Sequence, residues 1–123
     1  SGAYSEEFGR QAAQAIHGMQ DYRPTAVYAT SDIIALGLYK EFLKLGYTLP
    51  EQMSIGGFGD VEFASYLSPS LTTVRIPTHE IGVQVADMLK TMLSSKIIRY
   101  MKVVLEAELV IRESTIKLKL AKE

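Results

Sequence analysis

Residues 24–32 decide the fold, and they read Pro24-Thr25-Ala26-Val27-Tyr28-Ala29-Thr30-Ser31-Asp32. The run Ala26–Ala29 is short and apolar, which predicts a buried strand, and Arg23-Pro24 ends the helical pattern that precedes it. Ser31 and Asp32 are residue types that begin helices. A strand that turns directly into a helix is typical of a protein in which strands and helices alternate.

Periodicity continues this alternation on both sides. Apolar residues at helical spacing predict a helix after Ser5, a second from about Asp32 to Leu45, and a third from Thr78 to about Ser94. Their apolar stripes are Phe8, Ala12, Ala15, Ile16 and Met19; Ile34, Leu38, Phe42 and Leu45; and Ile81, Val85, Met88, Leu89 and Met92. Gly46 is placed to close the second helix. Further strands are predicted at Met53–Phe58, Leu71–Val74 and Val103–Ile111.

These elements predict an α/β fold with three layers, in which a mostly parallel sheet lies between helices. The strands Ala26–Thr30, Met53–Phe58 and Leu71–Val74 are expected to be parallel and buried, because a sheet covered on both faces has continuous apolar strands. In open sheets of this kind, ligands bind beyond the carboxyl ends of the strands. Those ends carry Thr30-Ser31-Asp32, Gly59-Asp60 and Arg75-Ile76.

The composition limits the class of function. The chain has 123 residues, 47% of them hydrophobic, with a formal net charge of −1, which favours one domain without an overall attraction to nucleic acid. It has no cysteine, which excludes disulfides and thiolate metal sites. No apolar run reaches the ~20 residues of a membrane span, so no membrane partner is expected. The chain opens into a helix pattern rather than a signal peptide, and we expect further residues upstream.

The polar residues at the strand ends have two interpretations, and the sequence leaves both open. Ser31 and Asp32 can cap the second helix, and one of them can also present a hydroxyl or carboxylate to a ligand. The run Gly56-Gly57-Phe58-Gly59-Asp60 lacks the spacing of a phosphate-binding loop. Its glycines indicate tight turning, and Asp60 either accepts hydrogen bonds from a polyol or bonds its own backbone in a turn.

No catalytic constellation is visible. His17 and His79 are the only histidines. His17 lies near the end of a predicted helix, where we expect a surface position favoured by the helix dipole rather than a ligand. His79 has no histidine or acid at metal-ligand spacing beyond the neighbouring Glu80. The sequence contains no nucleophile elbow and no zinc-protease motif. We therefore expect a protein that is not an enzyme and that needs no cofactor and no metal.

Several short motifs follow one another along the chain. They are Pro24–Asp32, Ala35-Leu36-Gly37, Leu45-Gly46, Leu49-Pro50-Glu51, Ser54-Ile55, Gly57-Phe58, Asp60, Pro69, Leu71–Val74, Pro77, Glu108–Val110 and Arg112–Thr115. In this order and at these spacings they resemble one family, the LacI/GalR bacterial transcription regulators, and the resemblance runs from about residue 4 to residue 116.

The resemblance implies the carboxyl-terminal part of an effector-binding domain with the type I fold of periplasmic binding proteins. Residues 1–76 would form part of the carboxyl-terminal subdomain, 77–96 a helix of the amino-terminal subdomain, 97–116 a strand segment that returns, and 117–123 a tail. The family implies a cytoplasmic homodimer that binds a sugar-like effector and reaches operator DNA through an amino-terminal headpiece that this chain lacks. A swapped oligomer of this chain is a further expectation.

The family's ligand contacts correspond to Tyr28, Ser31, Asp32, Gly59, Asp60 and Ile76. Two of these depart from the family's pattern, because Gly59 replaces an acid that usually holds effector hydroxyls and Ile76 replaces a polar residue, often glutamine. Both departures remove hydrogen-bonding groups from one wall of the expected pocket. A periplasmic-type sugar-binding protein for transport is the alternative function, and a doubly wound hydrolase is a third, disfavoured by the absence of a catalytic set.

Overall fold

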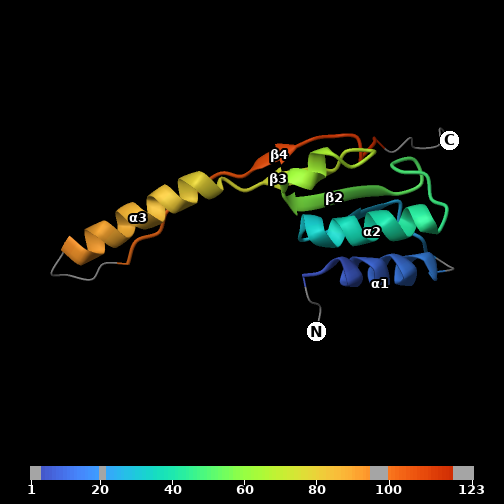
Figure 1. Cartoon of the computed structure of the whole chain (residues 1–123), viewed down its shortest axis with the longest axis horizontal. Coiled ribbons are helices and arrows are strands. Elements are labelled where there is room, and N and C mark those ends of the chain that lie inside the picture. Colours follow the sequence, from blue (N-terminus) through green and yellow to red (C-terminus); the bar gives the residue numbers. More distant parts are fainter. Residues whose placement is uncertain (1–3, 20–21, 95–99, 118–123) are drawn as a thin grey trace. The chain divides into compact units, whose positions relative to one another are not determined.

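The computed structural model describes residues 4–19, 22–94 and 100–117. The chain divides into two compact units, of which the first comprises Ser1–Arg75 with Leu109–Glu123 and the second Ile76–Glu108. The elements in chain order are α1 (Glu6–His17), β1 (Ala26–Tyr28), α2 (Asp32–Lys44), β2 (Ser54–Gly59), the 3-10 helix η1 (Glu62–Ser65), β3 (Thr72–Arg75), α3 (Thr78–Ser94) and β4 (Glu108–Val110) (Figure 1).

The sheet has the strand order β1-β2-β3-β4. β1 pairs with β2 in parallel, with Tyr28 opposite Gly56, and β2 pairs with β3 in parallel, with Gly57 opposite Thr73. The prediction of three parallel strands is therefore confirmed. The parallel arrangement brings the carboxyl ends of β1, β2 and β3 to the same edge of the sheet.

Helix α2 supplies five of the twelve buried hydrophobic residues that the structure describes in the core. Ser31 caps it, since its side chain accepts a hydrogen bond from the backbone N–H of Ile33, and Gly46 follows the helix with a φ of 84°. Leu38 and Phe42 of the predicted stripe are fully buried in the same core as Met53, which directly precedes β2, and Ile55, which lies in β2. The predicted stripe of the second helix is confirmed in these residues.

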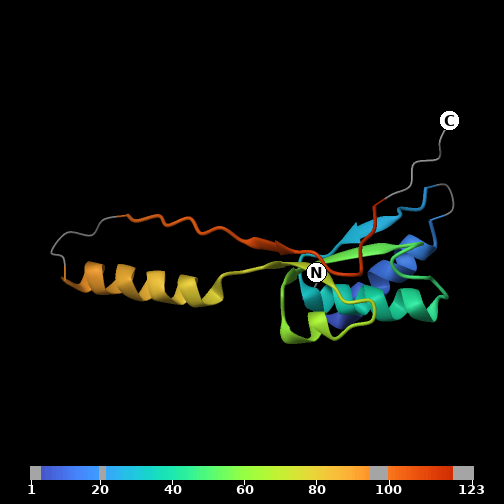
Figure 2. The same ribbon diagram turned by 90° about the horizontal axis from the view of Figure 1, so that it is seen from above.

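Helix α1 packs on α2, and both lie on the same side of the strands (Figures 1 and 2). The buried residues of α1 are Gly9 and Ala13, whereas Phe8 of the predicted stripe is 41% exposed. A Cβ on Gly9 would lie 2.1 Å from the backbone oxygen of Ile34, and one on Gly37 would lie 2.0 Å from that of Glu6. The stripe prediction for α1 was right for Ala12 and Ile16, which pack against the core, and wrong for Phe8, Ala15 and Met19, which are exposed. The two helix backbones approach so closely at Gly9 and Gly37 that only glycine fits there.

Strand β1 is less buried than its apolar sequence predicts. Ala26 and Tyr28 are exposed and Val27 is half-buried, whereas the first two residues of β2 are buried. β1 stands at one end of the strand order, so within the described residues no strand covers its outer edge. The prediction of a strand buried on both faces was therefore wrong for β1.

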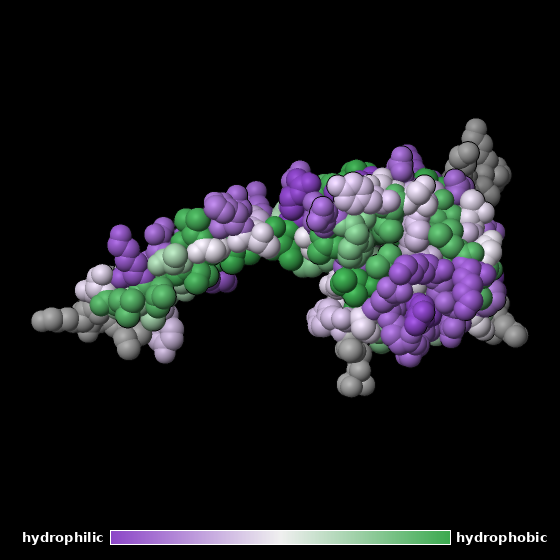
Figure 3. Space-filling view, in the orientation of Figure 1, coloured by the Kyte–Doolittle hydropathy of each residue, from purple (hydrophilic) through white to green (hydrophobic). Residues whose placement is uncertain are grey.

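The second unit consists mainly of α3, which has the predicted bounds and no buried residue along its described length. Hydrophobic residues lie along α3 in Figure 3. A groove of about 330 Å³ runs between α3 and the following segment, lined by Ile81, Gln84, Val85, Met88, Met101, Lys102, Val103 and Leu105.

The predicted last strand, Val103–Ile111, was too long. Regular strand is confined to β4, and residues 100–107 have no regular secondary structure. These residues are exposed, so their alternating apolar pattern has no partner strand to pair with in the part of the chain that the structure describes. Residues 97–99 of the predicted return segment and 118–123 of the predicted tail lie outside the described residues.

Candidate functional site

The candidate site is the edge formed by the carboxyl ends of β1, β2 and β3, which we call the carboxyl edge. It holds Ser31, Asp32, Gly59, Asp60 and Arg75. Ser31 Oγ accepts from the N–H of Ile33 at 3.3 Å, so the capping interpretation of Ser31 is confirmed, and the side chain is half-buried. Nothing in this geometry tests the ligand interpretation, which can hold at the same time because the hydroxyl keeps a proton to donate.

Asp32 has a buried carboxylate that connects three segments at the carboxyl edge through hydrogen bonds. The residue is 1% exposed. Its Oδ1 accepts from the hydroxyl of Thr73 at 2.7 Å, and its Oδ2 accepts from the backbone N–H of Val61 at 2.9 Å. The backbone N–H of Asp60 in turn donates to the hydroxyl oxygen of Thr73 at 3.4 Å. One carboxylate thus joins the start of α2, the loop after β2, and β3.

Gly57 of β2 makes room for this carboxylate. A Cβ on Gly57 would lie 2.2 Å from Oδ1 of Asp32, whereas a Cβ on Gly59 would lie 3.6 Å from Oδ2, an ordinary van der Waals contact. Gly59 also has a φ of 128°, a conformation that other residues rarely adopt. Gly57 therefore allows close packing on Asp32, and Gly59 allows the turn that the glycine-rich run predicts.

Asp60 lies between two arginines, and these three residues form what we call the Asp60 cluster. Its Oδ2 accepts from Nε of Arg75 at 2.7 Å, and its Oδ1 accepts from Nη2 of Arg112 at 2.6 Å. Its side chain is only 9% exposed. Burial acts to raise the pKa of Asp60, but the hydrogen bonds from Arg112 and then Arg75 outweigh it and hold the pKa below its ordinary value. Asp60 is therefore an ionised acceptor.

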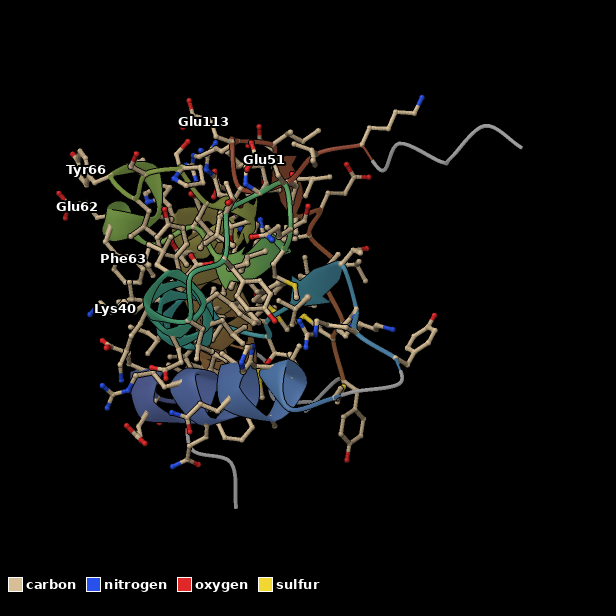
Figure 4. The ribbon with its side chains drawn as sticks, turned by 90° about the vertical axis from the view of Figure 1, so that its right-hand side faces the viewer. Lys40, Glu51, Glu62, Phe63, Tyr66 and Glu113 are labelled. Atoms are coloured by element: carbon tan, nitrogen blue, oxygen red, sulfur yellow. The ribbon has the colours of Figure 1, made fainter. Side chains whose placement is uncertain are left out.

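The segment after β4 is anchored to the same sheet. Ser114 is buried, and its hydroxyl donates to the backbone oxygen of Ile55 at 2.6 Å while accepting from the N–H of Thr72 at 2.8 Å. The carboxylate of Glu113, labelled in Figure 4, accepts from the N–H and the hydroxyl of Ser70, both at 3.1 Å. This anchoring holds Arg112 in position to reach Asp60.

The structure brings four of the six sequence-predicted site residues together at the carboxyl edge. Ser31, Asp32, Gly59 and Asp60 are neighbours there, whereas Tyr28 is 58% exposed on β1, with its ring over Gly56. Ile76 belongs to the second unit. The ligand-binding role of all six residues stays a prediction.

Sequence reasoning missed the partners that organise the edge. Thr73 was treated only as a motif residue, and Arg75 and Arg112 were not assigned to Asp60. The signal for Arg75 was available, because a cation at the end of a neighbouring parallel strand must lie close to Asp60. Arg112 lies 52 positions from Asp60 in sequence, and no local pattern pairs them.

A separate cavity lies at the opposite end of the strands. It measures about 560 Å³ and is lined by residues at the starts of β1 and β2 and near the chain's end, including Ala26, Ser54 and Ile116. It is mostly apolar and does not include the predicted site. Within residues 4–19, 22–94 and 100–117, no helix is long and apolar enough to cross a membrane, and no cluster of three or more metal-ligating side chains occurs.

The fold and the polar strand ends define an α/β domain of the ligand-binding type. A family model described as "Periplasmic binding protein-like domain" matches residues 2–115. The chain therefore belongs to the family of periplasmic binding protein-like domains, in the form that LacI/GalR regulators carry.

Similar proteins include transcriptional repressors. The chain is 40% identical over 100 residues to the ribose operon repressor of Haemophilus influenzae, which covers 81% of this chain and 30% of that protein. It is 38% identical over 109 residues to the HTH-type transcriptional repressor PurR of Vibrio vulnificus, covering 87% of this chain and 32% of that protein. The chain thus spans about a third of the length of these curated relatives.

Solved structures give the same result. A LacI family transcriptional regulator from Enterococcus faecalis V583 with bound ribose matches with a TM-score of 0.87 and 31% identity, over 97% of this chain and 43% of that chain. The predicted α/β fold, mostly parallel and periplasmic-binding-protein-like, is therefore confirmed as a fragment of that fold. These relatives are regulators, so the alternative of a transport binding protein is not favoured.

Proposed function

We propose that this chain is the carboxyl-terminal part of the effector-sensing domain of a LacI-type transcription repressor that responds to a sugar or a similar small molecule. The observation that carries the proposal is the family match over residues 2–115, which includes all the strand ends of the carboxyl edge. The protein would act in the cytoplasm by binding and conformational change, without a catalytic step.

The proposed ligand-binding residues are Tyr28, Ser31, Asp32, Gly59, Asp60 and Ile76. Their geometry suggests two different roles, direct contact with the ligand and support of the carboxyl edge. Ser31 and Tyr28 keep hydroxyl groups that can reach a ligand, whereas Asp32 and Asp60 accept hydrogen bonds from Thr73, Val61 and the arginines and hold the edge in shape. Gly59 lines the edge with backbone alone.

The proposed mechanism needs a second half of the ligand cleft. Residues 1–76 would contribute one wall, the helix within 77–96 would belong to the amino-terminal subdomain, and 97–116 would return to the first. A ligand that binds a closed arrangement of subdomains more tightly than an open one would shift the population toward closure. In a homodimer, that shift would change the spacing of amino-terminal DNA-binding headpieces on operator DNA.

The test uses the full-length protein translated from the gene that encodes this chain. We expect specific binding to a DNA segment upstream of a neighbouring operon, and a change in that DNA affinity when a small-molecule effector is added. Asp60→Ala should weaken effector binding by about 1–3 kcal/mol, because a buried charged hydrogen-bonding group is lost. DNA binding that no effector changes, or a full-length protein without any DNA affinity, would contradict the proposal.

A further inference from the structure

The chain passes between its two units twice. The first unit ends at Arg75 and resumes at Leu109, and the second unit, Ile76–Glu108, lies between these points in the sequence. We call the two boundaries the first crossing and the second crossing. Strand β3 leads into the first crossing, β4 spans the second, and the two strands are neighbours in the sheet. The first unit therefore releases the chain and takes it back at neighbouring strands.

Asp60 binds an arginine at each crossing. Arg75 is the last residue of the first unit before the first crossing, and its Nε donates to Oδ2 of Asp60 at 2.7 Å. Arg112 follows the second crossing directly after β4 and residue 111, and its Nη2 donates to Oδ1 of Asp60 at 2.6 Å. Because each oxygen accepts from a different arginine, one carboxylate joins the chain segments on both sides of the second unit.

The position of Asp60 is itself fixed by the carboxyl edge. Its backbone N–H donates to the hydroxyl oxygen of Thr73 at 3.4 Å, and that hydroxyl donates to the buried carboxylate of Asp32 at 2.7 Å. Asp60 has a φ of 51°, a conformation that is uncommon for a residue with a side chain and persists where the surrounding structure holds it. A shift at the carboxyl edge therefore reaches both arginines through Asp60.

We propose that Asp60 is a positioning residue that couples the two crossings, so that a displacement at one crossing is transmitted to the other. Its role in regulation rests on the proposed function, in which an effector changes the arrangement of the subdomains and both crossings must change together. The hydrogen bonds from Asp32 through Thr73 connect this coupling to the proposed ligand-binding residues. The coupling itself needs no ligand, so the free protein already contains it.

Amide hydrogen exchange on the full-length protein, without effector or DNA, tests the coupling. Arg112→Gln removes a hydrogen bond at the second crossing, and the exchange is measured at the first crossing, in the backbone amides of Val74–Ile76. We expect exchange there to become about tenfold faster, the effect of losing one charge-assisted hydrogen bond on a local opening equilibrium. Arg112→Lys, which keeps a cation beside Asp60, should restore most of the protection.

A matched control loosens the chain after β4 without touching Asp60. Glu113 is the neighbour of Arg112 in sequence, and its carboxylate accepts from the N–H and the hydroxyl of Ser70. Glu113→Ala should accelerate exchange in the segment after β4 and leave the first crossing unchanged. If pairing between β3 and β4 alone coupled the crossings, this control would accelerate exchange at the first crossing as much as Arg112→Gln does.

A double variant separates two routes from Arg112 to β3. Arg112 also donates from Nη1 to the backbone oxygen of Leu71 at 2.8 Å, directly before β3. If the route runs through Asp60, the double variant Asp60→Asn, Arg112→Gln should exchange no faster at the first crossing than Asp60→Asn alone. Additive effects would assign the route to Leu71 and overturn the proposal.

The remaining outcomes are equally decisive. Exchange at the first crossing that Arg112→Gln leaves unchanged, or that Glu113→Ala accelerates equally, would also overturn the coupling through Asp60. Melting curves show whether each variant is folded. If Arg112→Gln is not, Asp60→Asn takes its place, since it should accelerate exchange at both crossings and a change at neither would contradict the proposal. Such a failure would leave an effector-sensing domain in place, whereas a protein without operator binding would refute the proposed function and not the coupling.

Discussion

Helices α2 and α3 both carry apolar stripes, but they bury them to very different extents. Leu38 and Phe42 of α2 are 1% and 0% exposed, whereas Val85 and Leu89 of α3 are 57% and 55% exposed. The stripe of α2 packs between β2 and α1 within the first unit. An amphipathic pattern thus predicts a helix reliably without indicating whether its partner lies in the same chain.

The difference has an energetic consequence for α3. Full burial of a large aliphatic side chain is worth ~1.5–3 kcal/mol, and α3 leaves Ile81, Val85, Leu89 and Met92 between 39% and 57% exposed. We therefore infer that the first unit buries its own hydrophobic core, whereas α3 presents an apolar surface that packs against a partner. Substitutions at matched positions in the two units test this contrast.

The largest effect is expected at the glycine crossing of α1 and α2. Gly37→Ala would place a Cβ 2.0 Å from the backbone oxygen of Glu6, so the helices must separate, at a cost of about 3 kcal/mol in unfolding free energy. In Gly82→Ala, the added Cβ on α3 meets no atom within 4 Å, and the substitution should instead stabilise the helix by ~0.5–1 kcal/mol. Urea unfolding followed by circular dichroism measures both. Equal effects at the two positions would show that α3 is as tightly packed as α2.

A smaller loss of stability is expected when Asp32 is replaced by the neutral asparagine. Asp32→Asn replaces one acceptor oxygen by an N–H₂ group, which cannot accept from Thr73 or Val61, and should cost about 2 kcal/mol in unfolding free energy. Asp87→Asn is the matched control, because Asp87 is exposed on α3, and it should change stability by less than ~0.5 kcal/mol. A neutral outcome for Asp32→Asn would mean that its buried hydrogen bonds do not hold the carboxyl edge.

The smallest effect concerns the pH dependence of the Asp60 cluster. Because the folded pKa of Asp60 lies below its ordinary value of 3.8, its ion pairs stabilise the fold above that pH, and the contribution is lost as the pH falls through the folded pKa. Asp60→Asn should reduce the unfolding free energy by about 1 kcal/mol at neutral pH. The difference in unfolding free energy between this variant and the parent chain should shrink as the pH falls below 3.8. A difference in unfolding free energy that stays constant with pH would contradict the ion-pair explanation.

The sequence predicted the parts of the fold that depend on local pattern. The bounds of α2 and α3, the closing role of Gly46 and the parallel strands follow from capping residues and periodicity alone. The exposure of β1 could not be predicted, because it depends on its position in the strand order. The close approach of α1 and α2 was missed because a stripe of large side chains is the usual signal of a helix contact, and here Gly9 and Gly37 make it.

The candidate site was predicted in location and not in its internal bonding. The rule that ligands bind at the carboxyl ends of parallel strands led to Ser31, Asp32 and Asp60. The partners of Asp60 lie 15 and 52 positions away in sequence, so only the folded sheet and the return of the chain after β4 bring them together. Charge pairing across such separations has no periodic signal in one sequence.

The most direct test of the contrast between the units is the mass of the isolated 123-residue chain in sedimentation equilibrium at micromolar concentration. We predict a dimer or a larger oligomer that dissociates when Val85 and Leu89 are both replaced by serine, because the exposed stripe of α3 must find a partner. Amide hydrogen exchange in the same samples should show α3 protected only in the oligomer. A single-chain mass at all concentrations, with α3 as protected as α2, would contradict the assignment of α3 to a surface that this chain leaves incomplete.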